Sequence, residues 1–284
     1  MTMEELKNIN ELVNRQAVSC EHYNFKLPKS NAHISILRVK NGNSDAINSC
    51  INEYLYIEVN QLFELTKCHA FIFDVSNLIT NEKADYHKIL SNQIRRKHPI
   101  FLVGNTAISD TNFNLSTSCV DALNTASKML KKYSHGGKYS PISESYYLEH
   151  RHAVNFDISK IGHNCLNWKI NEQNIGAYVS MSGELPPGSA GYLDALEIKW
   201  LLRKVCILSK PRALVVDLSH LDYQWGDDLD LYPGNFWQPD SLIRFIIPHK
   251  LRSSYSGFVH ENQMSENFAS ARQELESLIK GNGD

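Results

Sequence analysis

Two stretches of the sequence decide the fold: Ala70-Phe71-Ile72-Phe73-Asp74-Val75-Ser76-Asn77-Leu78 and Ala213-Leu214-Val215-Val216-Asp217-Leu218-Ser219-His220-Leu221. They superpose when the chain is shifted over itself by 143 residues, and four of the nine positions are identical. Each is a continuous apolar run that ends in Asp, which is typical of a buried strand in a covered, largely parallel sheet. The chain is therefore expected to hold two copies of one unit.

The segments around these strands extend the repeat. At the same offset, residues with the 4, 3, 1 spacing of one helix face match: Leu55, Val59, Leu62 and Phe63 with Ile198, Leu202, Val205 and Cys206. At an offset of 145 the terminal helices match: Leu123, Ala126, Leu130 and Tyr133 with Phe268, Ala271, Leu275 and Leu278. Each unit is expected to end in an amphipathic helix.

The other expected strands complete the unit. An early strand is Tyr23–Leu27 in the first copy and Val154–Ile158 in the second, at an offset of 131, which implies an insertion near Ile161–Asn174. Further strands are expected at Ile34–Leu37, Ile100–Val103, Ala177–Met181 and Phe245–Ile247. The unit thus reads β-β-α-β-β-α.

Strands that alternate with helices predict an α/β fold. We expect two tandem divergent repeats, each a mixed or mostly parallel sheet with helices, related by a pseudo-two-fold axis. The repeats are placed at residues 21–133 and 149–284, on either side of a Gly/Ser/Pro linker at 134–148. Residues 1–20 are expected to form an N-terminal helix with the stripe Leu6, Ile9, Leu12 and Val13.

Composition narrows the class of protein. The 284 residues include 29 basic and 31 acidic side chains, so the net charge of −2 gives no general reason to bind nucleic acid or anionic lipid. The sequence contains neither a signal-peptide pattern nor a run of 18 apolar residues, so no membrane span is expected. Six scattered cysteines without a C-x-x-C pair predict reduced thiols in a cytoplasm.

The most unusual segment is Leu221–Asp240, which interleaves Asp with Trp, Tyr and Phe. From Ala213 to Ile243 there are six Asp and no Lys or Arg. Aromatic rings supply anchor area and carboxylates pair with Arg or Lys, so this segment is expected to recognise a protein with a basic surface. The expected partner-binding residues are Asp222, Tyr223, Trp225, Asp227, Asp228, Asp230 and Trp237.

Two other readings of the segment remain open. The aromatics could cover the sheet while the carboxylates form a solvated rim. Asp227, Asp228 and Asp230 could hold a divalent cation, although their spacing differs from the D-x-D-x-D-G calcium loop. The first copy has Ile79–Tyr86 at the equivalent place, without Trp, so function is expected in the second copy alone.

Motifs of common enzyme classes are missing from the sequence. Neither G-x-G-x-x-G, G-x-x-x-x-G-K-[ST] nor G-x-S-x-G occurs. His150, His152, His163 and Cys165 lack a second ligand pair at zinc-site spacing, and the histidines are expected to be exposed or to anchor the linker. No catalytic, cofactor-binding or metal-binding residue is assigned.

A family resemblance is carried by Ser182-Gly183-Glu184-Leu185, the following helix and Ala213–Tyr223. This stretch resembles the STAS domain of anti-sigma-factor antagonists, which has a Gly-Glu-Leu turn, a helix and a strand that ends in Asp-Leu-Ser. The resemblance covers about 45 residues and implies a protein-binding regulatory fold. The family's phosphorylated Asp-Ser-Ser/Thr-Gly loop is replaced here by Gln224-Trp225-Gly226-Asp227-Asp228.

The same region is also similar to the crotonase superfamily, in which a Gly-Ala-Asp-Leu turn helps to bind an acyl-CoA thioester. Gly226-Asp227-Asp228-Leu229 is the nearest match. This resemblance implies Gly226 in an oxyanion hole and Asp227 or Asp228 as acid or base.

The leading functional hypothesis is a non-enzymatic cytoplasmic binding protein that neutralises a partner through the acidic-aromatic segment of the second copy. In general character the chain resembles bacterial immunity proteins, which protect a cell from a toxin made by its kin. The alternatives are a crotonase-like acyl-CoA enzyme and a STAS-type regulatory module.

Overall fold

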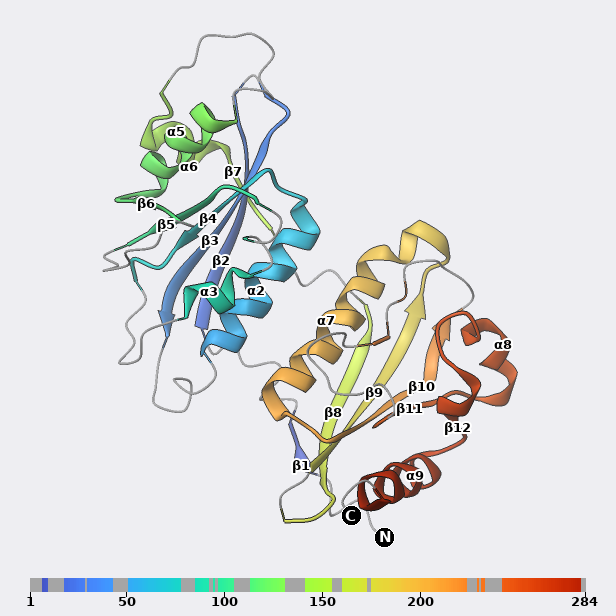
Figure 1. The fold of residues 1–284 in the computed structure, drawn as a ribbon. Helices are drawn as coiled ribbons and strands as arrows, with labels where there is room; N and C mark the ends of the chain where they lie inside the picture. Colours follow the sequence, from blue (N-terminus) through green and yellow to red (C-terminus); the bar gives the residue numbers. More distant parts are fainter. Residues whose placement is uncertain are drawn as a thin grey trace. The chain divides into compact units, whose positions relative to one another are not determined.

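The structure is a computed structural model. It describes residues 7–9, 18–28, 30–42, 51–77, 85–91, 94, 97–104, 113–130, 141–154, 160–172, 175–223, 229, 231–232 and 242–281. The chain divides into two compact units, an N-terminal unit of Gln16–Asn155 and a C-terminal unit of Met1–Arg15 with Phe156–Asp284. Each unit contains one six-stranded mixed sheet with helices (Figure 1), so the α/β class is confirmed.

The N-terminal unit has the strand order β6-β5-β4-β3-β2-β7. Its elements are β2 (Val18–Lys26), β3 (His33–Gly42), α2 (Ile51–Thr66), β4 (Ala70–Asp74), α3 (Tyr86–Ile89), β5 (Ile100–Val103), β6 (Asn114–Ser116), α5 (Cys119–Met129), α6 (Glu144–His150) and β7 (Arg151–Ala153). The strands from β3 to β6 are parallel, β2 is antiparallel to β3, and β7 is antiparallel to β2.

The C-terminal unit has the strand order β1-β8-β9-β10-β11-β12. Its elements are β1 (Lys7–Asn8), β8 (Gly162–Lys169), β9 (Ile175–Leu185), α7 (Tyr192–Ser209), β10 (Ala213–Tyr223), β11 (Ile243–Ile246), α8 (Arg252–Tyr255), β12 (Met264–Ser265) and α9 (Phe268–Gly281), with short 3-10 turns at Gly188–Gly191, His249–Leu251 and Glu261–Gln263. The strands from β9 to β12 are parallel, β8 is antiparallel to β9, and β1 is antiparallel to β8.

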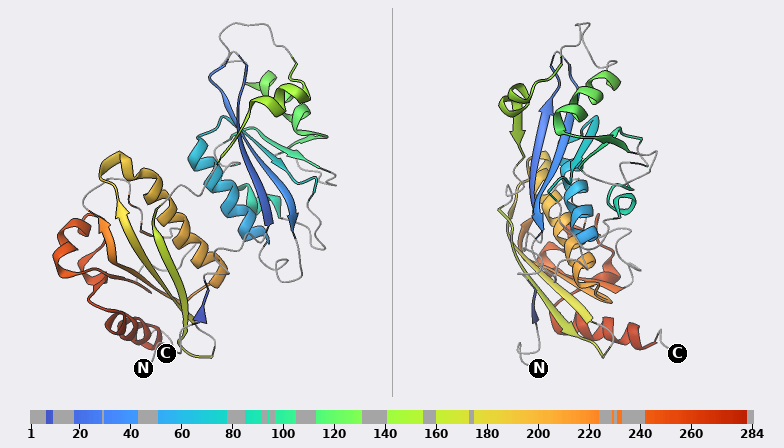
Figure 2. Two further views of the ribbon diagram at one scale, coloured as in Figure 1. Left: turned by 180° about the vertical axis from the view of Figure 1, so that it is seen from behind. Right: turned by 90° about the vertical axis from the view of Figure 1, so that its left-hand side faces the viewer.

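Both faces of each central strand are buried, as the continuous apolar runs predicted. In β10, Leu214, Val216 and Leu218 lie in one core with residues of α7, which runs along that face of the sheet (Figure 2). Ala213 and Val215 lie in a second core with Ala271 and Leu275 of α9. Because side chains alternate between the faces of a strand, one short run supplies two cores.

The first long strand of the C-terminal unit differs from the prediction. It is β8, Gly162–Lys169, and not Val154–Ile158. The Val154 amide donates to the His22 carbonyl oxygen at 2.8 Å in the N-terminal unit, and residues 155–159 lie outside the described residues. The insertion was expected near Ile161–Asn174, and this region contains β8, the strand that pairs with β9. In β8, polar residues such as Asn164 and Asn167 separate the apolar ones, which hid the strand.

The segments expected as an N-terminal helix and a linker also differ. Lys7–Asn8 is a strand and Val18 begins β2, whereas the remainder of 1–17 apart from Ile9 lies outside the described residues. Within the expected linker, Ser143 caps α6, whose Tyr147 is buried in the N-terminal core. Pairing of β1 and β7 with distant strands decides these segments, and local periodicity does not reveal such pairing.

Candidate functional site

The carboxyl ends of β9 and β10 project beyond the rest of the sheet. The neighbouring strand β11 ends at Ile246, opposite Asp217, whereas β10 continues past Asp217 to Tyr223 and remains paired with β9 as far as Leu185. The register shifts between Asp217 and His220, which marks a bulge. We call Ser182–Leu185 and Ser219–Tyr223 the ribbon, and it belongs to the C-terminal unit.

The two faces of the ribbon differ in chemistry. Leu185, Leu221 and Tyr223 are buried in the α7-side core, while Glu184 and Asp222 are exposed. Glu184 and Asp222 are direct register partners on neighbouring parallel strands, so their carboxylates lie on the same solvent-facing side. The ribbon therefore presents a small acidic face immediately before the acidic-aromatic segment.

Gly183 shapes this ribbon. The Gly-Glu-Leu sequence lies inside β9 rather than in a turn, and Gly183 has a φ of +125°. A Cβ at this position would lie 3.1 Å from the Lys160 carbonyl oxygen, in a backbone conformation that residues with a side chain rarely adopt. Glycine is thus required for the strand to carry Glu184 to its exposed position.

The structure places two of the seven expected partner-binding residues. Asp222 is exposed near the end of β10. Tyr223 is 2% exposed, and its ring centroid lies 4.9 Å from that of Tyr255 and 6.0 Å from that of Phe258, so it is a core residue of the C-terminal unit. The other five lie outside the described residues, as does Gly226: Trp225, Asp227, Asp228, Asp230 and Trp237.

Three described residues tie the acidic-aromatic segment to the unit. Leu229 and Leu231 are buried in the α7-side core. The Tyr232 hydroxyl donates to Gln263 Oε1 at 2.6 Å, and its ring packs edge-on against Phe245. Leu229, Leu231 and Tyr232 are therefore anchored to the core of the C-terminal unit.

Asp217, the Asp that ends the apolar run of β10, accepts two structural hydrogen bonds in the C-terminal unit. Asp217 Oδ2 accepts a hydrogen bond of 2.6 Å from the Tyr178 hydroxyl, and Oδ1 accepts one of 2.9 Å from the Ser219 amide. Burial, and then the hydrogen bond to Asp217, raise the pKa of Tyr178 above its ordinary value. This phenol remains protonated at neutral pH, and its hydrogen bond to Asp217 joins the side chains of β9 and β10.

The N-terminal unit holds a polar cluster that the sequence analysis missed, at the carboxyl end of β4, where Asp74 lies opposite Arg38 in the middle of β3. Asp74 Oδ2 accepts from Arg38 Nε at 2.8 Å and from the Cys119 thiol at 3.2 Å. Its Oδ1 accepts from the Ser76 amide at 3.1 Å and from the Ser76 hydroxyl at 2.6 Å. The Asp-Val-Ser sequence was a visible signal for the Ser76 contacts, but nothing local pointed to Arg38 or Cys119.

The ionisation of this cluster fits a structural role. Burial opposes the charge of Asp74, but hydrogen bonds from Ser76, Cys119 and Arg38 outweigh it and hold its pKa below the ordinary value. Burial and the Asp74 charge raise the pKa of Cys119 to about 12, so the thiol stays protonated. A buried, protonated thiol is a poor nucleophile, so the cluster joins β3, β4 and α5 without offering a reactive group.

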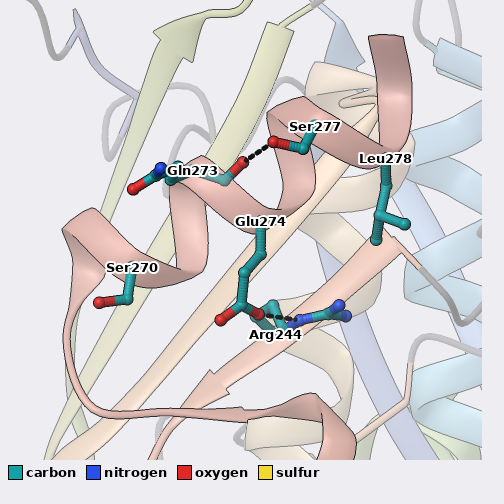
Figure 3. A pocket seen from close by; sticks show the side chains of 6 residues that line it. All are labelled: Arg244, Ser270, Gln273, Glu274, Ser277 and Leu278. Atoms are coloured by element: carbon teal, nitrogen blue, oxygen red, sulfur yellow. Dashed lines mark hydrogen bonds and ion pairs between the residues drawn. The ribbon is translucent and has the colours of Figure 1, made fainter. Parts of the chain in front are cut away.

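A shallow pocket of about 690 Å³ lies beside α9 (Figure 3). Its lining consists of Arg244, Ser270, Gln273, Glu274, Ser277 and Leu278. Arg244 Nε and Glu274 Oε2 form an ion pair of 2.8 Å across it. The charged groups neutralise each other, which leaves the pocket without a strong preference for a charged ligand.

The residues that the structure describes contain no group of three or more His, Cys, Asp or Glu placed to hold a metal ion. His150 stacks on Tyr146 of α6 in the N-terminal unit, whereas Cys165 is buried in the core of the C-terminal unit. Among the described helices, none combines the length and apolar character needed to cross a bilayer.

Comparisons with protein-family models, curated proteins and solved structures gave no match for this chain.

Proposed function

We propose that the protein is a non-enzymatic binding protein that neutralises a basic protein partner, in the manner of an immunity protein, through the ribbon and the acidic-aromatic segment that follows it. The observation that carries the proposal is the exposed carboxylate pair Glu184 and Asp222, which leads directly into a segment rich in Asp and Trp. Loops that follow the carboxyl ends of parallel strands are the usual place for binding residues in α/β sheets.

The charge of this region favours a basic partner. Glu184 and Asp222 are exposed, and apart from the buried Asp217 the stretch from Ala213 to Ile243 contains five Asp and no Lys or Arg. Negative charge of this kind would accelerate encounter with a positively charged protein and pair with its Arg and Lys side chains. Trp225 and Trp237 are the proposed anchor residues, and Tyr223 supports the segment from the core.

A cytoplasmic location is part of the proposal. The described cysteines are all free thiols: Cys20, Cys68, Cys119, Cys165 and Cys206. Free buried thiols suit a reducing compartment, because an oxidising one favours disulfides.

We also propose that the two units are divergent copies related by a pseudo-two-fold axis. The strand directions in the order β7-β2-β3-β4-β5-β6 are the same as those in the order β1-β8-β9-β10-β11-β12. α5 and α9 both begin after a side chain that accepts a hydrogen bond from the backbone amide three residues later. Ser118 accepts from the Asp121 amide, and Asn267 accepts from the Ser270 amide. The ribbon distinguishes the C-terminal copy, which supports a division of labour in which that copy binds the partner.

The test compares proteins retained by the immobilised chain from an extract of the source cells. The binding variant carries Trp225→Ala, Asp227→Lys and Asp228→Lys, and the matched control carries Glu172→Lys and Glu266→Lys, which are exposed on the same unit. We expect a basic protein that the wild type and the control retain at low salt and the binding variant loses. Loss of one interface Trp typically weakens binding by about 30-fold or more.

Two results would count against the proposal. One is retention of the same set of proteins by all three forms. The other is that the control variant loses the partner as completely as the binding variant does, which would mean that the change in net charge alone explains the loss of binding. Circular dichroism of each form confirms that the fold is intact.

A further inference from the structure

The two edge strands β1 and β7 pair with the unit that does not follow them in the chain. β1 precedes β2 in sequence but pairs with β8, and β7 precedes β8 but pairs with β2. Both pairings are antiparallel. β1 lies at the edge of its sheet beside β8, and β7 lies at the edge of its sheet beside β2. Within the described residues, β8 and β2 are each antiparallel to the parallel strands of their own sheet. The chain consequently passes between the units near residues 15 and 155.

We propose that the two units have reciprocally exchanged equivalent leading strands, and that β1 acts as an N-terminal clasp on the C-terminal unit. The equivalence of β1 and β7 rests on the duplication proposed above. The clasp itself rests only on the pairing of β1 with β8. It makes the unit with the ribbon dependent on a segment more than 150 residues away in sequence.

Ile9 provides the packing that holds the clasp. Its side chain is 5% exposed in the α7-side core, with Cys165 and Val179 in the same cluster, whereas Lys7 and Asn8 are exposed. The Ile9 amide donates to the Cys165 carbonyl oxygen at 2.9 Å, which extends the pairing beyond Asn8. β1 also covers the outer edge of β8, which would otherwise present unpaired backbone groups to other chains.

The strand register shows which backbone amides of β8 depend on pairing with β1. Lys7 lies opposite Asn167, and Ile9 bonds to Cys165, so the amides of Cys165 and Asn167 point toward β1. Hydrogen-bonding direction alternates along an antiparallel strand, so the amides of Leu166 and Trp168 point toward β9 instead. One strand thus contains both the test positions and their internal controls.

β7 provides the corresponding test and control amides in the N-terminal unit. The Val154 amide bonds to the His22 carbonyl oxygen, so by the same alternation the His152 amide points toward β2 and the Ala153 amide points away. The guanidinium carbon of Arg151 lies 4.4 Å from the ring centroid of Tyr23, which adds a cation–π contact to the pairing.

The experiment measures residue-resolved hydrogen exchange in the full chain. Ile9→Asp places a carboxylate at the buried position, and Lys7→Asp places one at an exposed position of the same strand. We expect Ile9→Asp to accelerate exchange at Cys165 and Asn167 at least about tenfold more than Lys7→Asp does, with smaller changes at Leu166 and Trp168. Loss of protection throughout the C-terminal unit, with the N-terminal unit unchanged, would also support the clasp.

Equal exchange in the two variants would overturn the clasp, and so would a loss of protection confined to the N-terminal unit. The exchange of strands is tested separately by His152→Pro, with Ala153→Pro as the control. Proline has no backbone N–H, so His152→Pro removes an amide that points toward β2, whereas Ala153→Pro removes one that points away from it. His152→Pro should expose the amides of His22 and Asn24 and leave those of Cys165 and Asn167 protected; the opposite pattern would refute it. None of these changes touches the acidic-aromatic segment, so partner binding by folded variants remains a separate measurement.

Discussion

Replacing Asp74 and Asp217 one at a time by Asn provides a matched comparison of the two units. Each carboxylate terminates the same kind of apolar run and each is at most 9% exposed. They differ in their partners, because Asp74 accepts from the Arg38 guanidinium whereas Asp217 accepts from the neutral Tyr178 hydroxyl. We expect Asp74→Asn to destabilise the N-terminal unit more than Asp217→Asn destabilises the C-terminal unit.

The magnitudes follow from the partners. Breaking a buried ion pair costs about 3–5 kcal/mol, because one charge is left without its partner. The Arg38 side chain is 24% exposed, so water compensates part of this loss, which reduces the cost to about 2–3 kcal/mol. In Asp217→Asn the amide oxygen still accepts from Tyr178, so the cost is about 1 kcal/mol.

Tryptophan fluorescence separates the two units during urea unfolding. The sequence has four Trp, and all belong to the C-terminal unit: Trp168, Trp200, Trp225 and Trp237. Fluorescence therefore follows that unit, while far-ultraviolet circular dichroism follows both. With a slope of about 2 kcal/mol per molar urea, Asp74→Asn should lower the midpoint of the N-terminal unit by about 1 M, and Asp217→Asn should lower the fluorescence midpoint by about half as much.

If Asp74→Asn lowers the urea midpoint of the N-terminal unit no further than Asp217→Asn lowers that of the C-terminal unit, the Arg38 charge does not set the difference. A shift of the fluorescence transition by Asp74→Asn, without one of the dichroism transition, would show that Asp74 stabilises the C-terminal unit instead.

Two further predictions concern acid stability and the support of the proposed binding segment. The pKa of Asp74 is lower in the folded chain than its ordinary value, so its stabilisation is present above about pH 4 and is lost as pH falls through the folded-state pKa. Acid titration of the N-terminal unit should show this loss in the wild type and a smaller one in Asp74→Asn; parallel curves would contradict it. Tyr223→Ala should destabilise the C-terminal unit by about 3–5 kcal/mol, measured by fluorescence-detected unfolding, because it empties a buried aromatic site. A cost below about 1 kcal/mol would mean that Tyr223 is not the core residue described above.

The central strands and the long helices could be read from the sequence. The first five residues of the stretch at Ala70 form β4, and the stretch at Ala213 lies within β10. The helical spacing of Ile198, Leu202 and Val205 marked the buried face of α7. These predictions succeed because burial on one or two faces imposes a short repeat on the sequence itself.

The candidate site was predictable only in part. The composition of the segment after β10 drew attention to Asp222, which is exposed, and to Tyr223, which packs in the core instead. Glu184 went unnoticed as a neighbour of Asp222, because the register of β9 against β10 depends on the bulge between Asp217 and His220. A single-residue shift in register exchanges the faces of every side chain, and local composition does not encode that shift.

The sequence alone determined the two apolar strands that end in Asp, the helix faces that cover them and the location of the acidic-aromatic segment. Only the tertiary structure decided that Arg38 and Cys119 meet Asp74, and that β1 and β7 complete the sheets of distant segments. The physical reason is that edge pairing uses backbone amides and carbonyls, which nearly every residue carries, so the choice of partner leaves little trace in side-chain pattern.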